Sequence, residues 1–221
     1  MLIKTRGIVL NYLKYRDTSI IVKVYTEKLG LRSYIINGIR SSRSRSKIAL
    51  FQPLTLLDLV VYTKNTDLNR IKEYRVCEPV VSIPFDVRKS SIAIFLAELL
   101  AKSIREEEEN PALFDFIFQS ILILDHMQQG FMNFHLQFIL KLSRFLGFAV
   151  EKADNLRMDL QFPGDLDVVI NELIASRYEN EIRITKEQRL EVLDVLQTFF
   201  RHHFHIQGDF KSIKVLREVM N

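Results

Sequence analysis

The chain has 221 residues, of which 48% are hydrophobic and 26% charged, so its composition is that of a folded protein and excludes wholesale disorder. Its single cysteine, Cys77, excludes an internal disulfide and a zinc site built from cysteines. The net charge of +4 is unevenly distributed, because residues 1–80 carry +9 and the remainder carries −5. This asymmetry favours a polyanionic partner for the N-terminal part of the chain.

Residues 1–82 are predicted to form five short strands, because β-branched and aromatic residues alternate with polar ones between turn signals. The expected strands are Ile3–Leu10, Ser19–Tyr25, Leu31–Ile36, Leu54–Tyr62 and Leu68–Cys77. Gly30 is expected to supply a positive φ to the turn before the third strand. Five strands in about 80 residues favour a small closed barrel of the OB type, although an SH3-like barrel fits this count about as well.

A basic segment, Asn37–Lys47, separates the third and fourth strands. It contains Arg40, Arg43, Arg45 and Lys47 with four serines and no carboxylate, so its cations cannot all be paired locally. The segment has no apolar periodicity, and we interpret it as a mobile basic loop.

Tyrosines are interspersed with the basic residues of the strand region. They are Tyr12, Tyr15, Tyr25, Tyr34 and Tyr62, among Lys4, Arg6, Lys14, Arg16, Lys23 and Arg32. Single-stranded nucleic acid is bound in this way, because cations follow the backbone while aromatic rings stack on bases. About half of these tyrosines are expected to fill the barrel core instead.

Residues 83–221 are predicted to be mainly helical, because apolar residues recur with i, i+3, i+4 spacing. Asn110 and Pro111 mark one helix start, and Thr185 with Gln188 forms a capping box at another. The spacing of Phe131, Phe134 and Phe138 predicts core positions, and a last short helix carries Ile213.

The sequence carries no motif of enzymatic chemistry. Its seven glycines are too far apart for a phosphate loop or a dinucleotide-binding fingerprint, and it lacks HExxH and GxSxG. The cluster His202, His203 and His205 is interpreted as a helix end whose histidines contact terminal carbonyls. We therefore expect a protein that is not an enzyme and that uses no cofactor or metal.

Several segments, in order, resemble the recombination mediator RecO family. They are TRGIVLNYLKYRDTSIIVKVYTEKLG from Thr5, NGIRSSRSRSKIALFQPLTLLDL from Asn37, IFLAELL from Ile94 and FKSIKVLREVM from Phe210. The resemblance extends over nearly the whole chain. It implies an α+β protein, with an N-terminal OB fold at 1–82 and a helical domain at 83–221.

The resemblance also implies a function in DNA repair. Such a protein binds single- and double-stranded DNA, anneals complementary strands and helps load recombinase at gaps. The implied partners are RecR and the acidic C-terminal tail of the single-strand-binding protein. The segments that match the family contain the basic residues Arg40, Arg43, Arg45 and Lys47.

Charge and strand placement add Arg6, Lys14, Arg16 and Arg32 to the expected DNA-binding residues, and Tyr34 is added as a stacking ring. Two other interpretations stay open: an RNA-binding OB protein of translation, and a protein-interaction scaffold whose basic face is incidental. A competition between RNA and DNA would separate the first from the DNA-repair interpretation.

The chain departs from the family in one region. Many members carry a four-cysteine zinc ribbon in the helical half, which Cys77 alone cannot form. Residues 148–184, expected to be irregular, would replace that ribbon and would be held by apolar contacts of Leu156, Leu160, Phe162 and Leu166.

The expected location is the cytoplasm, in association with the nucleoid and without a membrane partner. The N-terminus lacks the apolar segment and cleavage site of a signal peptide. No stretch approaches the ~18 consecutive apolar residues of a membrane span.

Overall fold

The computed structural model of the protein describes residues 1–40, 45–62, 68–105, 108–206 and 208–220, without the side chains of residues 45 and 46. Backbone contacts divide the chain into two compact units. The barrel unit comprises Met1–Val81 with Ala97–Ile121, and the helical unit comprises Ser82–Leu96 with Leu122–Asn221. The domain boundary expected after residue 82 stays a prediction.

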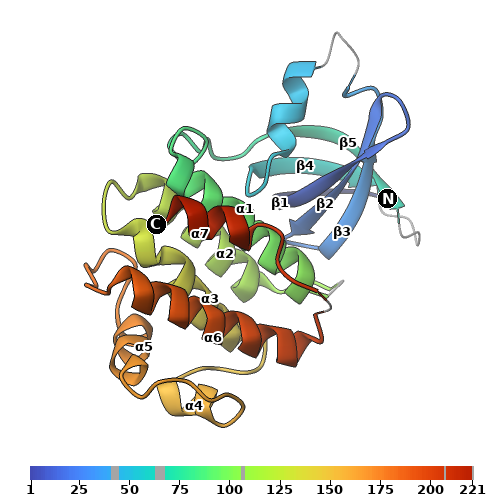
Figure 1. The fold of residues 1–221 in the computed structure, drawn as a ribbon. Coiled ribbons are helices and arrows are strands. Elements are labelled where there is room, and N and C mark those ends of the chain that lie inside the picture. Colours follow the sequence, from blue (N-terminus) through green and yellow to red (C-terminus); the bar gives the residue numbers. More distant parts are fainter. Residues whose placement is uncertain (41–44, 63–67, 106–107, 207, 221) are drawn as a thin grey trace. The chain divides into compact units, whose positions relative to one another are not determined.

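The barrel unit contains a closed five-stranded barrel in the order β1-β2-β3-β5-β4 (Figure 1). Its strands are β1 (Leu2–Tyr15), β2 (Ser19–Thr26), β3 (Gly30–Ile36), β4 (Leu56–Tyr62) and β5 (Leu68–Val76). Four of the five pairings are antiparallel, whereas β3 and β5 pair in parallel. This order and the non-consecutive parallel pair are those of the OB fold, which decides against the SH3-like alternative.

The first strand is longer than predicted. It continues past Leu10 to Tyr15, across an irregularity in its register with β2 between Val9 and Asn11. Such an irregularity bends a strand and lets it wrap further around a barrel. The fourth strand begins two residues later than predicted, because Leu54 has a φ of 64° and leaves the extended conformation.

The basic segment is only partly a loop, which corrects the interpretation of Asn37–Lys47. Residues Arg45–Phe51 form the 3₁₀ helix η1, so Arg45 and Lys47 lie on a helix. The apolar residues of this helix explain the difference. Phe51 is fully buried in the barrel core, and Ile48 and Leu50 pack against that core.

The barrel interior is closely packed around Gly7. A Cβ atom at Gly7 would lie 2.7 Å from Leu59 Cδ1 and 2.8 Å from Val24 Cγ1. Both distances are shorter than van der Waals contact, so any larger residue forces neighbouring core side chains to move. Gly30 has a φ of 63°, as predicted for the β2–β3 turn.

The end of α1 and the first part of α2 pack on the outer surface of the barrel within the barrel unit. Tyr25 of β2 is fully buried, and its ring centroid lies 6.1 Å from that of Phe114. Lys23 Nζ donates a hydrogen bond of 3.0 Å to the carbonyl oxygen of Ala101. One end of the outer β2 surface is therefore covered within the barrel unit itself.

The helical unit is formed by helices that surround an aromatic core. The helices of the chain are α1 (Val87–Ser103), α2 (Pro111–His126), η2 (Phe131–Asn133), α3 (Phe134–Phe145), α4 (Ala153–Arg157), α5 (Leu166–Ala175), α6 (Lys186–Phe204) and α7 (Ile213–Val219). Phe131, Phe134 and Phe138 are buried, as predicted. The rings of Phe95 and Phe210 meet edge to face at 5.8 Å.

The predicted signals for helix termini are present. Asn110 Oδ1 accepts a hydrogen bond from the amide of Leu113, and Pro111 is the first residue of α2. The Thr185–Gln188 capping box begins α6. At the other end of α6, His203 Nδ1 lies 3.1 Å from the carbonyl oxygen of Phe199, in agreement with the helix-end interpretation.

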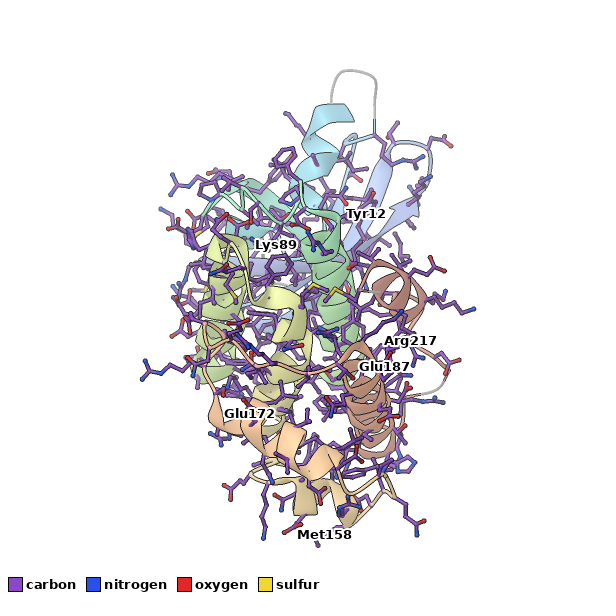
Figure 2. The ribbon with its side chains drawn as sticks, turned by 60° about the vertical axis from the view of Figure 1, so that its left-hand side comes forward. Tyr12, Lys89, Met158, Glu172, Glu187 and Arg217 are labelled. Carbon is purple, nitrogen blue, oxygen red and sulfur yellow. The ribbon has the colours of Figure 1, made fainter. Side chains whose placement is uncertain are left out.

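A polar anchor holds the start of the helical unit. One carboxylate oxygen of Asp125, Oδ1, accepts hydrogen bonds from the backbone amides of Ser82 and Ile83, at 2.7 and 2.8 Å. Lys89, labelled in Figure 2, donates to Ser82 Oγ at 2.7 Å and to the Asp125 carbonyl at 2.9 Å. Burial lowers the pKa of Lys89, because it removes water from the charged ammonium group.

The region expected in place of a zinc ribbon is held by an arginine as well as by apolar contacts. Leu156 and Leu166 are fully buried, as expected, but the irregular region also contains α4 and α5. Arg157 pairs with Asp167 at 2.8 Å, and its guanidinium group lies 4.1 Å from the ring centroid of Phe162. It also donates to the carbonyl of Phe162 at 2.9 Å, so one side chain connects three parts of the region.

Candidate nucleic-acid interface

The OB topology identifies the barrel surface on which a binding site is expected. OB folds bind oligonucleotides on the surface of strands 2 and 3, next to the connections between strands 1 and 2 and between strands 4 and 5. Here the first connection contains Arg16, Asp17 and Thr18. The second, residues 63–67, lies outside the described residues.

Three predicted basic residues meet at the end of the barrel formed by the β1–β2 connection. The backbone amide of Arg40 donates to the carbonyl of Thr18 at 2.9 Å, and its Nη1 donates to the carbonyl of Arg16 at 3.2 Å. Lys14 is the penultimate residue of β1, and Arg16 follows the strand directly. We call Lys14, Arg16 and Arg40 the basic rim.

The basic rim retains its positive charge. Lys14 and Arg16 are exposed, and Arg40 is half-buried. None of the three forms an ion pair with any residue that the structure describes, although Asp17 lies in the same turn. The guanidinium group of Arg16 lies 5.3 Å from the ring centroid of Tyr15, which holds it beside an aromatic surface.

Arg6, also predicted to bind DNA, has a different environment. It donates to both carboxylate oxygens of Glu27, at 3.0 and 2.8 Å, and pairs with Asp115 at 3.2 Å. Its guanidinium group also lies 4.8 Å from the ring centroid of Phe118. The hydrogen bond from Arg6 lowers the pKa of Glu27, and the same pair raises the pKa of Arg6. Two carboxylates therefore neutralise Arg6, and we omit it from the candidate interface.

Tyr34 does not have the accessible ring that base stacking requires. Its side chain is only 1% exposed and lies among the barrel core residues, so a base cannot reach it. Burial raises the pKa of Tyr34 to about 12, because the phenolate form has lost its water. Tyr34 pairs with Val22 of the neighbouring strand β2, which is fully buried in the same core. Both side chains therefore point into the barrel.

The other predicted residues have mixed placements. Arg32 is half-buried in β3, opposite Val24. Lys47 is exposed on η1. Arg43 and the side chain of Arg45 lie outside the described part of the chain. Of the remaining tyrosines, Tyr25 is buried, Tyr12 and Tyr15 are half-buried, and Tyr62 is 40% exposed.

Two residues at this surface were missed by the sequence reasoning. Leu13 is 68% exposed on β1, and Arg70 is exposed on β5 with no ion-pair partner among the described residues. Leu13 was missed because the first strand was predicted to end at Leu10. Alternation continued through residues 11–15 would have placed Leu13 on the outer face of the barrel.

The wall of the barrel formed by β1, β4 and β5 carries a cavity of about 520 Å³. Its lining includes two ion pairs, Arg6 with Glu27 and Arg75 with Asp58. Positive and negative charges alternate there, so this surface is less suited to a polyanion than the basic rim.

The helical unit has a cavity of about 510 Å³, lined by Asn133, Arg189, the apolar residues Met132, Ile182 and Ile184, and the ion pair of Arg183 with Glu181 among others. Asn133 donates to the carbonyl of Ile182 at 2.8 Å and accepts from Arg189 Nε at 2.9 Å, which fixes the arginine. Burial lowers the pKa of Arg189, since no carboxylate pairs with it among the described residues. A carboxylate would compensate this half-buried positive charge.

The described residues form neither a metal-binding cluster nor a membrane-spanning helix. Among the described residues, no cluster of three or more His, Cys, Asp or Glu side chains could hold a metal ion. Within the same part of the chain, no helix is both long and apolar enough to cross a bilayer.

Comparisons with known proteins agree with the barrel and the helices. The family model "Recombination protein O N terminal" matches residues 1–80, and "Recombination protein O C terminal" matches residues 84–159. Proteins named DNA repair protein RecO align over the full length of both chains. Their identities are 47% in Phocaeicola vulgatus, 38% in Bacteroides fragilis and 34% in Flavobacterium psychrophilum. The chain therefore belongs to the RecO family of DNA repair proteins.

Proposed function

We propose that this protein binds single- and double-stranded DNA at the basic rim of its OB barrel and anneals complementary strands. One observation carries the proposal: Arg40 is hydrogen-bonded to the β1–β2 connection that contains Arg16, Lys14 lies at the adjoining end of β1, and no described carboxylate pairs with any of the three. Arginine and lysine bind phosphates by charge and hydrogen bonding, and the OB scaffold presents them to an oligonucleotide.

The proposed mechanism is electrostatic. Annealing brings two polyanions together, and cations that neutralise phosphates reduce the repulsion between the strands and release their counterions. The rim holds the first strand, and the basic segment after Arg40 contacts the second. These steps need no proton transfer or bond cleavage, so the protein acts without an enzymatic reaction.

DNA affinity measured across a salt series tests the site. We expect log affinity for a fluorescent single-stranded oligonucleotide to fall steeply with log salt. The double variant Lys14→Gln/Arg16→Gln should make that slope shallower by about 1.4, because each lost phosphate contact contributes ~0.7. Glutamine at position 16 keeps the local backbone unchanged, since arginine there already has a φ of 48°.

A matched control removes the same charge from the helical unit. Arg144 and Lys214 are exposed and unpaired among the described residues, so Arg144→Gln/Lys214→Gln should leave the slope unchanged. Equal slopes for both double variants would contradict the rim as the binding site. Tighter binding of RNA than of DNA in direct competition would favour the translation alternative.

Annealing is tested separately, with two complementary oligonucleotides whose pairing quenches a fluorophore. The wild type should accelerate pairing, and Lys14→Gln/Arg16→Gln should lose most of that acceleration. If the wild type binds DNA but leaves the pairing rate unchanged, the annealing part of the proposal fails. If it does not bind DNA at all, the scaffold interpretation takes its place.

We also propose that the protein acts with RecR in loading recombinase, and that the helical unit receives the acidic tail of the single-strand-binding protein. Membership of the RecO family supports both partners. The Arg189 cavity supports the second, because it combines a half-buried unpaired cation with apolar walls. A fluorescent peptide with the acidic tail sequence should bind, and the same peptide with an amidated C-terminus should bind more weakly. Equal binding of the two peptides would place the terminal carboxylate outside this cavity.

A further inference from the structure

An apolar row crosses the outer surface of the barrel next to the basic rim. The register pairs Leu13 of β1 with Ile21 of β2, and Ile21 with Ile35 of β3. Ile35 pairs in turn with Arg70 of β5. Directly paired residues of neighbouring strands lie on the same face of a sheet, so Leu13, Ile21, Ile35 and Arg70 form one continuous row.

The alternation of burial shows that this row faces outward. Ile20 and Val22, the neighbours of Ile21 in β2, are fully buried in the barrel core. Tyr34 and Ile36, the neighbours of Ile35 in β3, are 1% and 8% exposed in the same core. Successive side chains of a strand point to opposite faces, so Ile21 and Ile35 lie outside the barrel.

The row is uncovered at its β1 end. Leu13 is 68% exposed, while Ile21 and Ile35 are half-buried. The next outward residue of β2, Lys23, is bonded to the carbonyl of Ala101, which marks the edge of the surface covered by residues 97–121. Helix packing therefore covers one end of the outer β2 surface and leaves Leu13 accessible.

The charges around the row indicate what it binds. Arg16 lies in the connection that follows Leu13, and Arg70 pairs with Ile35 on one side and with Tyr62 of β4 on the other. Lys14 pairs with the buried Ile20, so its side chain leaves β1 on the other face, at the basic rim. No described residue forms an ion pair with any of these three cations. An apolar strip about 10 Å across, flanked by cations, matches a ligand with apolar faces on an anionic backbone. Single-stranded nucleic acid has that chemistry, because its bases are uncovered.

We infer that the row Leu13–Ile21–Ile35 contacts the bases of single-stranded DNA, while the basic rim and Arg70 contact the phosphates. This inference rests on the proposed function and adds a base contact to it. Aliphatic side chains pack against any base without reading its edge, so the contact does not depend on sequence. In a duplex the faces of the bases are covered by their neighbours, so the row distinguishes single strands from duplex DNA.

The test compares Leu13→Ser with Met158→Ser in the full-length protein. Met158 is 83% exposed in the helical unit, so it controls for the loss of an exposed apolar side chain outside the barrel. Leu13→Ser should weaken binding to a single-stranded oligonucleotide about fivefold, at the low end of base-stacking contributions. Its salt slope and its duplex affinity should stay at the wild-type values, because no phosphate contact is lost. Met158→Ser should change none of these quantities.

Two further measurements test the base contact without relying on the small loss of affinity expected for Leu13→Ser. Leu13→Trp adds an aromatic face and should strengthen single-strand binding. Oligonucleotides that carry 4-thiothymine should form photo-crosslinks to residues within 12–21 or 33–36. Circular dichroism of each variant checks that the barrel is folded.

The outcomes separate this inference from the proposed function. Wild-type salt-dependent binding with equal single-strand affinities for Leu13→Ser and the wild type would overturn the base contact and leave the rim intact. A parallel loss of duplex affinity would also overturn it, because the row would then act without regard to exposed bases. If the wild type binds no DNA, both the inference and the proposed function fail.

Discussion

The two ends of the outer β1–β2 surface contain the same kinds of residue and differ in what surrounds them. At one end, Arg6 is neutralised by Glu27 and Asp115 and lies against Phe118. At the other end, Lys14 and Arg16 are exposed and have no ion-pair partner among the described residues. A basic residue on an OB barrel thus stabilises the fold at one end of a strand and remains available to a ligand at the other.

The largest expected effect on stability follows from removing Arg6. Arg6→Met leaves Glu27 without its bidentate partner at a site where both side chains are about two-thirds buried. We expect a loss of about 2 kcal/mol in the free energy of unfolding, measured by urea denaturation. The DNA salt slope of the folded variant should match that of the wild type. A reduced slope would contradict the structural role assigned to Arg6.

Acid should weaken the same pair. Because the hydrogen bond from Arg6 lowers the pKa of Glu27 in the folded protein, its ionised form stabilises the fold at neutral pH. That contribution is complete above the ordinary glutamate pKa of 4.5 and is lost as the pH falls through the lowered value. Urea denaturation of the wild type and Glu27→Gln should therefore show a difference at pH 7 that shrinks toward pH 3. A constant difference would contradict the pairing.

Asp115→Asn should have a smaller effect. Asp115 is 62% exposed, so water screens its attraction to Arg6 and the expected loss is about 0.5 kcal/mol. High salt should reduce this loss further, whereas the Arg6→Met loss should persist, since it also removes contact with aromatic rings. Urea denaturation at low and high salt measures both effects. A salt-independent loss of 2 kcal/mol or more at Asp115 would contradict the proposed screening.

The smallest expected effect on stability is at the basic rim. Lys14→Gln removes an exposed, unpaired cation and should change the free energy of unfolding by less than about 0.5 kcal/mol. It should nevertheless reduce DNA affinity. Removing Lys14 therefore affects binding more than stability, whereas removing Arg6 affects stability more than binding. A large destabilisation by Lys14→Gln would show that the rim is part of the folding framework.

A similar contrast exists in the region that lacks the zinc ribbon. The sequence predicted apolar contacts there, and Leu156 and Leu166 are indeed buried. It did not indicate that Arg157 would pair with Asp167 and also bond the carbonyl of Phe162. These partners lie five and ten residues away, in no regular pattern that sequence periodicity reports.

The sequence was sufficient to predict the five strands, a small closed barrel, the helices with their capping signals and the family resemblance, whereas the strand order that separates an OB barrel from an SH3-like one came from the structure. Alternation, turn residues and apolar spacing are local properties, and each reports directly on local structure. The concentration of positive charge in residues 1–80 was equally visible. The sequence did not show which of these cations form ion pairs within the fold and which remain accessible.

Tertiary structure alone decided which residues remain accessible to a ligand. Glu27 lies 21 residues from Arg6 along the chain and Asp115 lies 109 residues away, so no local pattern reveals that they neutralise it. Tyr34 was expected to be accessible but is buried, whereas Leu13 was given no role and is exposed. The closure of the barrel buries the tyrosine, and the continuation of β1 to Tyr15 exposes the leucine. Burial and pairing depend on contacts between distant segments, which form only when the barrel closes and residues 97–121 pack against it.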